Sequence, residues 1–146
     1  MTLATRKRGR TYGGRDGNAF SAWPHECGQH PNFYRLSVHA KAMLFELLSQ
    51  YRGRNNGDLT AAWGVLKDRG LGSRNTVYRA ERELLRTGWI YRTRQGGRNR
   101  CHLYALTFFD VDECDGKLDT PELVGQRLSY WKLGYNPELS SQQEAA

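Results

Sequence analysis

The chain has 146 residues and a formal net charge of +7, and 38% of its residues are hydrophobic. This length suits one domain with flanking segments and is sufficient to bury a hydrophobic core. No apolar run approaches the roughly 18 residues of a membrane-spanning helix, and the N-terminus lacks the apolar stretch of a secretory signal. The sequence therefore favours a cytoplasmic protein without membrane contact. Its three cysteines are widely spaced, which argues against a disulfide framework.

Charge is divided unevenly along the chain. Residues 1–105 contain 19 Lys and Arg against 7 Asp and Glu, whereas residues 106–146 contain 3 against 8. A basic body with an acidic end suggests a polyanionic partner. A basic protein that has no such partner is an equally good explanation of the charge alone.

Residues 1–32 show little apolar periodicity, and we expect a mostly irregular basic arm that Phe20 and Trp23 attach to the domain. Its basic cluster would either follow a groove of DNA or act as a solubilising tail: Arg6, Lys7, Arg8 and Arg10. A small group of potential metal ligands lacks the paired spacing of a zinc site, so we expect no metal: His25, Cys27, His30, Cys101 and Cys114.

The first predicted helix begins near Ser37, a residue type that caps helices. Apolar residues at helical spacing give it a core face: Ala40, Leu44, Leu47, Leu48 and Tyr51. The Asn-Gly pair at 56–57 predicts a tight turn, and Asp58 and Leu59 are candidates for a very short strand.

Two more helices and a hairpin follow. We expect Thr60 to cap a second helix that ends before Gly70, and Ser73 to cap a third that ends before Gly88. Trp, Ile, Tyr and Leu are frequent in the next two segments, which predicts strands at 89–94 and 100–108. The turn between these strands is expected at Gln95-Gly96-Gly97.

Residues 111–146 begin with an acidic stretch, and we expect an extended tail with one short helix near 121–130. Its aromatic residues would contact a partner or a second copy, or would pack on their own domain, which is slightly favoured: Tyr130, Trp131 and Tyr135.

The order helix, short strand, helix, helix, strand, strand predicts an α+β fold with a winged helix-turn-helix domain at residues 33–110. Two helices joined by a short glycine-containing turn are the helix-turn-helix unit, and the hairpin after them would be the wing. The first helix and the two strands would form the core that presents the third helix.

The third predicted helix has one apolar side and one basic side. At about 100° per residue, its apolar residues gather on one side: Val77, Ala80, Leu84 and Leu85. The first turns of a recognition helix reach base edges in the major groove, so the candidate base readers are Arg74, Asn75, Tyr78 and Arg79. Arg82 and Arg86 would contact phosphates. Glu81 and Glu83 are expected to pair with arginines three or four positions away. The competing interpretation is an ordinary solvated helix face.

The predicted hairpin loop is also basic. Its candidate contacts to the DNA backbone are Arg94, Gln95, Arg98, Asn99 and Arg100. Such contacts supply affinity and register, not sequence information. Charges that keep a strand edge from pairing with other strands are the competing explanation.

No catalytic motif is present: the sequence has no nucleophile elbow, no His-Glu-x-x-His and no phosphate-binding P-loop. We therefore expect neither an enzyme nor a cofactor.

The part of the chain from Phe33 to Asp112, with the few residues after it, resembles a known class of proteins. Three stretches are the basis of this resemblance: AKAMLFELLSQYRGRNNGDL at 40–59, LLRTGWIYRTRQGGRNRCHLYALT at 84–107 and DECDGKL at 112–118. They resemble winged-helix proteins of prophages and mobile elements. The resemblance implies a DNA-binding regulator or a replication-associated factor in a bacterial host cell. The basic arm and the segment after Leu118 do not match that pattern.

The sequence thus favours non-catalytic binding of double-stranded DNA, with a homodimer plausible because such proteins often bind paired half-sites. The alternative is a protein that uses the same scaffold to inhibit a host protein or nucleoprotein complex.

Overall fold

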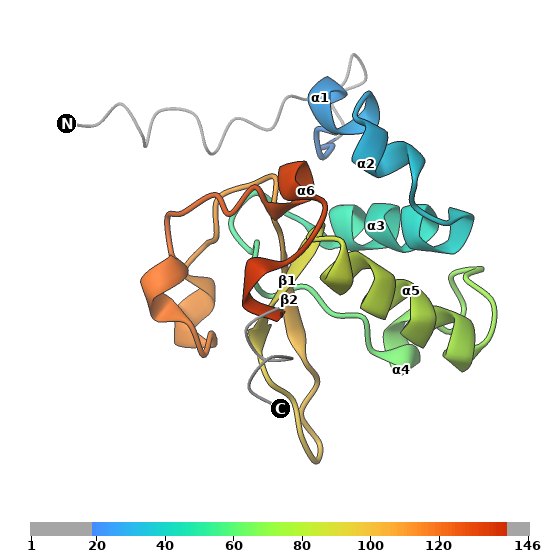
Figure 1. Cartoon of the computed structure of the whole chain (residues 1–146). Helices are drawn as coiled ribbons and strands as arrows, with labels where there is room; N and C mark the ends of the chain where they lie inside the picture. Colours follow the sequence, from blue (N-terminus) through green and yellow to red (C-terminus); the bar gives the residue numbers. More distant parts are fainter. Residues whose placement is uncertain (1–18, 140–146) are drawn as a thin grey trace.

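The computed structural model describes residues 19–139, so the cluster at Arg6–Arg10 lies outside the described part. The helices of residues 25–86 lie on one side of a β-hairpin, and the segment of residues 110–128 lies on the other (Figure 1). The elements, in chain order, are α1 His25–Gly28, α2 Pro31–Tyr34, α3 Val38–Gln50, α4 Trp63–Leu66, α5 Arg74–Arg86, β1 Ile90–Arg94, β2 Leu103–Leu106, the 3-10 helices η1 Cys114–Gly116 and η2 Pro121–Leu123, and α6 Tyr130–Leu133. The predicted α+β class is confirmed. Within the described ranges, no helix is both long and apolar enough to cross a bilayer.

The two long helices begin where the sequence predicts. Ser37 Oγ accepts a hydrogen bond from the Ala40 amide at 3.1 Å, and Ser73 Oγ accepts one from the Thr76 amide at 3.2 Å. Both predicted apolar faces are buried except for Tyr51, which is half-buried. Helices α3 and α5 pack against each other through these faces.

The sheet consists of the antiparallel β1–β2 hairpin and one further bridge. Leu59 pairs with Tyr104 of β2, with amide-to-carbonyl distances of 3.2 and 2.8 Å, so a single bridge at Leu59 stands where the short strand was predicted at residues 58–59. The register of β1 against β2 shifts between Arg92 and Arg94, so Thr93 lies in a bulge. Its hydroxyl is buried and donates to the carbonyl of Gly57 at 2.6 Å, which ties the hairpin to the turn before the short strand.

The predicted second helix is much shorter than expected, and Thr60 does not cap it. Gln50, the last residue of α3, bonds to both backbone groups of Thr60: its Oε1 accepts from the amide at 2.8 Å and its Nε2 donates to the carbonyl at 2.9 Å. These bonds keep Thr60 outside any helix, and α4 begins at Trp63. Gly70 has a positive φ of 78°, as expected after a helical segment.

The chain before α3 is more ordered than predicted. Residues 25–28 form α1 and residues 31–34 form α2, and Cys27 is buried in the main core. Trp23 packs as expected, with its ring 5.3 Å from Phe33 and 5.5 Å from Phe108 between centroids. The apolar periodicity missed these helices because each is only four residues long.

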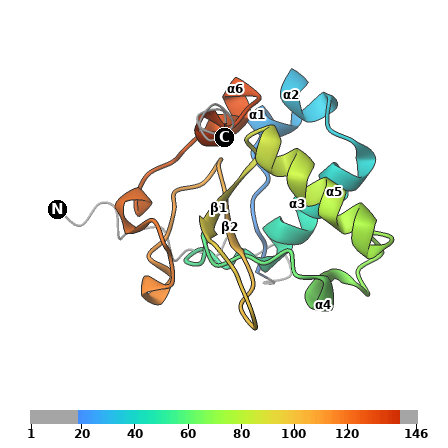
Figure 2. The same ribbon diagram turned by 60° about the horizontal axis from the view of Figure 1, so that its bottom comes forward.

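The expectation of an extended tail after residue 110 is wrong for the described residues. Asp112 is buried: its carboxylate accepts from the backbone amide of Asn56 at 2.9 Å, and its own backbone amide donates to the backbone carbonyl of Asn56 at 2.8 Å. Helix α6 lies beside α1 and α2 (Figure 2), where Asn32 Nδ2 donates to the carbonyl of Trp131 at 2.8 Å. The Trp131 side chain stacks on Trp89 with centroids 5.2 Å apart. It therefore packs on its own domain, and a partner cannot use it.

Candidate nucleic-acid interface

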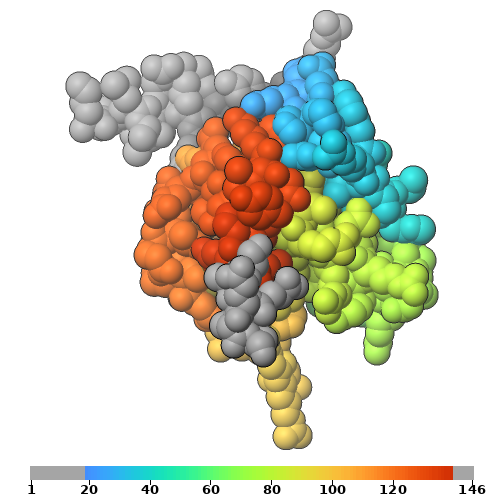
Figure 3. Space-filling model, in the orientation of Figure 1, coloured from blue at the N-terminus to red at the C-terminus, as the bar shows by residue number. Residues whose placement is uncertain are grey.

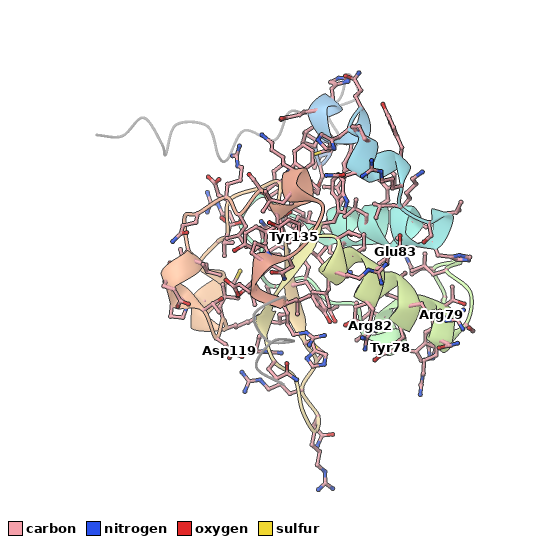
Figure 4. The ribbon with its side chains drawn as sticks, viewed as in Figure 1. Tyr78, Arg79, Arg82, Glu83, Asp119 and Tyr135 are labelled. Atoms are coloured by element: carbon pink, nitrogen blue, oxygen red, sulfur yellow. The ribbon has the colours of Figure 1, made fainter. Side chains whose placement is uncertain are left out.

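Helix α5 presents its basic residues on the side opposite the core. The six predicted contact residues of this helix are all exposed: Arg74, Asn75, Tyr78, Arg79, Arg82 and Arg86. Tyr78, Arg79 and Arg82 lie on the side away from α3, whereas Glu83 lies on the side that faces α3 (Figure 4). The structure thus brings the predicted contact residues of the helix onto one exposed surface.

The two glutamates of α5 do not pair with helix arginines, contrary to expectation. Glu81 accepts from the hydroxyl of Tyr104 and lies 3.4 Å from Arg92 of β1. Glu83 Oε2 accepts from the amide of Ser37, at 2.7 Å, at the start of α3. The arginines three or four positions away do not pair with these carboxylates, because both carboxylates point toward other elements of the fold. They fix α5 to its neighbours and leave the exposed side without negative charge.

Two arginines of α5 are held by aromatic rings. Arg82 Nη1 donates to the hydroxyl of Tyr78 at 2.9 Å, and its guanidinium lies 5.6 Å from the ring centroid. This hydrogen bond raises the pKa of Arg82 above its ordinary value. Arg74 lies 5.8 Å from the ring of Trp63 in α4. Both contacts orient a cation at the surface without neutralising it.

The hairpin projects from the body as a narrow finger (Figure 3). Its tip is formed by Arg98 and Asn99, which corrects the turn predicted at residues 95–97. Gly97 and Arg100 exchange backbone hydrogen bonds of 2.8 and 3.1 Å, and Asn99 has a positive φ of 59°. Arg98, Asn99 and Arg100 are exposed at this tip.

The other two predicted hairpin residues lie nearer its base. Arg94 is half-buried, and its Nη2 donates to the carbonyl of Cys101 at 2.9 Å. The Gln95 side chain is exposed, and the backbone amide of Gln95 donates to the carboxylate of Asp119 at 2.8 Å. The acidic segment thus braces the hairpin base.

A groove of about 490 Å³ separates α5 from the hairpin, and the sequence did not reveal it. The α5 residues on this side are spaced three and four apart, and residues of α4 and the hairpin complete the walls: Trp63, Arg74, Val77, Tyr78, Glu81, Gly96, Arg100, His102 and Tyr104. The helical spacing of 74, 77, 78 and 81 was the available signal, but only the hairpin register shows what faces these residues.

His102 has a fixed hydrogen-bonding role in this groove. Its Nδ1 accepts from the Gly96 amide at 2.7 Å. Burial and the nearby Arg92 charge lower the pKa of His102 below its ordinary value. Both effects favour the neutral ring, and in that form the acceptor role of Nδ1 places the proton on Nε2.

The cysteines and histidines do not converge. Cys27 is buried in the core, Cys114 packs beside Gly57, and Cys101 is exposed on the hairpin. Burial raises the pKa of the Cys27 thiol to about 12 and that of Cys114 to about 11. Within residues 19–139, no group of three or more His, Cys, Asp or Glu side chains is placed to hold a metal ion.

No protein-family model, curated protein or solved structure matches the chain. Its function is therefore inferred from the residues of this surface.

Proposed function

We propose that the chain is a winged helix-turn-helix protein that binds double-stranded DNA without catalysis. Helix α5 would enter the major groove, and the hairpin would act as the wing. The order of α3, the Leu59 bridge, α4, α5, β1 and β2 supports this assignment, because it places a two-helix unit directly before a projecting hairpin.

One feature carries the proposal: six exposed arginines are concentrated on α5 and the hairpin tip. Elsewhere on the surface, some basic side chains pair with carboxylates, as Arg69 does with Glu46 at 2.8 Å and Lys117 with Asp58 at 2.8 Å. On the proposed interface, no carboxylate among the described residues pairs with the exposed basic side chains: Arg74, Arg79, Arg82, Arg86, Arg98 and Arg100. A dense cationic surface without internal counter-charges is suited to a polyanion.

Each part of the interface has a distinct task in this proposal. Arg74, Asn75, Tyr78 and Arg79 lie in the first half of α5 and would read base edges, because arginine bonds guanine and asparagine bonds adenine in pairs of hydrogen bonds. Arg82, Arg86 and the hairpin arginines would contact phosphates. A transcriptional regulator and a replication-associated factor both fit this mode of binding.

The test compares two double variants that each remove two positive charges. Arg79→Ala/Arg82→Ala changes the proposed interface, whereas Arg35→Ala/Arg54→Ala removes exposed arginines outside α5 and the hairpin. Duplex affinity is measured by titration at several salt concentrations. We expect the interface variant to bind at least about tenfold more weakly, and each lost phosphate contact to reduce the salt slope by about 0.9.

The control variant should keep a salt slope close to that of the unchanged protein. Equal losses of duplex affinity in both variants would show that binding depends on the overall positive charge and not on this surface. No duplex binding at low salt would contradict the proposal and would favour a protein partner for this surface.

A further inference from the structure

The groove between α5 and the hairpin differs chemically from the outer side of α5. Tyr78 contributes an aromatic ring that is 52% exposed, and Trp63 and His102 contribute half-buried rings. The buried side chains of Val77 and Tyr104 lie at the groove floor. Aromatic and apolar groups therefore dominate this surface, whereas the outer side of α5 is cationic.

The charges of the groove are arranged around its rim. Arg74 and Arg100 are exposed lining residues, and neither pairs with a carboxylate of the described chain. The carboxylate of Glu81 is also present, but its bonds to Tyr104 and Arg92 occupy it and balance its charge. A ligand with a planar apolar part and a negative group nearby would match both features.

We propose that this groove holds one unstacked nucleobase of a DNA strand, with an adjacent phosphate at Arg74 or Arg100. The inference rests on the proposed function in taking DNA as the ligand. A volume of about 490 Å³ lies within the range of small-molecule sites and leaves room for a base and its sugar. Aromatic rings bind unstacked bases of any sequence through their faces, which a paired duplex does not offer.

The alternative that the groove holds only sugar and phosphate fits its chemistry less well. Phosphates bind where several cationic or amide donors converge, whereas the floor here is formed by Val77 and the ring of Tyr104. The protein would therefore engage DNA that has an unpaired base beside a duplex, such as an overhang, in addition to plain duplex.

The test uses two single strands of equal length, oligothymidine and an abasic strand with the same phosphates. Tyr78→Ala removes a ring, whereas Tyr78→Phe keeps the ring and removes only the hydroxyl. Tyr78 is exposed, so neither variant should disturb folding. We expect oligothymidine to bind about 5- to 100-fold more tightly than the abasic strand, and this preference to disappear in Tyr78→Ala but persist in Tyr78→Phe.

Tryptophan fluorescence gives a second measurement that does not depend on affinity. Stacking in the groove should quench Trp63 when oligothymidine is bound at saturation, and Trp63→Phe should abolish this quenching. The abasic strand should leave the fluorescence unchanged.

Equal affinity for the two strands, or a base preference that survives in Tyr78→Ala, would overturn the inference. Such a result, together with duplex binding that depends on Arg79 and Arg82, would leave the proposed function intact. The opposite result is a preference for oligothymidine that disappears in Tyr78→Ala, in a protein that does not bind duplex DNA. In that case the groove assignment would hold and the duplex proposal would fail.

Discussion

The side chain of Asn56 is fully buried and bonds to the last residue of β2 and to the segment that follows it. Its Oδ1 accepts from the Leu106 amide at 2.7 Å, and its Nδ2 donates to the carbonyls of Leu106, at 3.0 Å, and Asp110, at 3.0 Å. Its backbone amide donates to the carboxylate of Asp112. One residue of the Asn-Asn-Gly-Asp-Leu turn thus fixes the segment that follows the hairpin. The distinctive sequence of that turn has a structural explanation that involves no ligand.

At this scale we predict that Asn56→Ala lowers the free energy of unfolding by about 3 kcal/mol, because it leaves several buried backbone groups without partners. Urea denaturation measures the change. Asn55→Ala is the control in the same turn: Asn55 also bonds to the backbone, but one of its two bonds is exposed and water can replace it. The control should lose about 1 kcal/mol or less. Similar losses in both variants would show that Asn56 has no special role.

The hairpin depends on a close approach of its own two chain segments at Gly96. A Cβ atom at Gly96 would lie 2.5 Å from the carbonyl oxygen of Arg100 and 2.6 Å from the amide nitrogen of His102. These are backbone atoms, so a side chain there must shift the hairpin. At Gly97 a Cβ would meet nothing within 4 Å. The two adjacent glycines therefore have different roles, although the sequence presents them as one Gly-Gly loop.

This difference predicts opposite outcomes for two neighbouring substitutions. Gly96→Ala should destabilise the protein by about 2 kcal/mol through steric overlap, and should weaken both duplex and single-strand binding, because Arg98, Arg100 and the groove wall move together. Gly97→Ala should be neutral or slightly stabilising, since it restricts the unfolded chain without strain. Thermal unfolding and the two titrations described above measure these effects. A tolerated Gly96→Ala would contradict the hairpin geometry.

Features that depend on neighbouring residues could be predicted from the sequence, whereas features that depend on contacts between distant segments could not. Ser73 and the two sides of α5 depend on residues at most a few positions apart, so capping and periodicity predicted them. The tip at Arg98-Asn99 depends on the bulge at Thr93 and on contacts across the hairpin. The groove additionally requires α4, α5 and the hairpin to meet, and no local pattern encodes such a meeting.

At the scale of the whole molecule, the C-terminal segment is part of the body that supports the interface. Asn136 is buried, and its backbone amide donates to the carbonyl of Arg86, the last residue of α5, at 3.2 Å. Tyr91 of β1 donates its hydroxyl to Glu138 at 2.6 Å. The sequence could not predict these contacts, because their partners lie tens of residues away. The segment joins the end of α5 to the base of the hairpin, which are the two elements of the proposed interface.

Gly88 is the position where this docking can be tested. Gly88 and Gly70 both have a left-handed backbone, with φ of 83° and 78°, so alanine costs about 1–2 kcal/mol of backbone strain at either position. At Gly70 a Cβ would meet nothing within 4 Å, whereas at Gly88 it would lie 2.6 Å from the carbonyl oxygen of Tyr130 and 2.8 Å from that of Tyr135. Gly88→Ala must therefore also displace the C-terminal segment.

We predict that Gly88→Ala destabilises the protein by at least about 1 kcal/mol more than Gly70→Ala does. It should also expose Arg127 and Lys132 to faster tryptic cleavage under native conditions, because the segment that carries them is no longer held against α5. Gly70→Ala should leave the cleavage rate close to that of the unchanged protein. If both variants are cleaved equally fast, the effect is global unfolding, and the C-terminal segment does not depend on the end of α5 for its position.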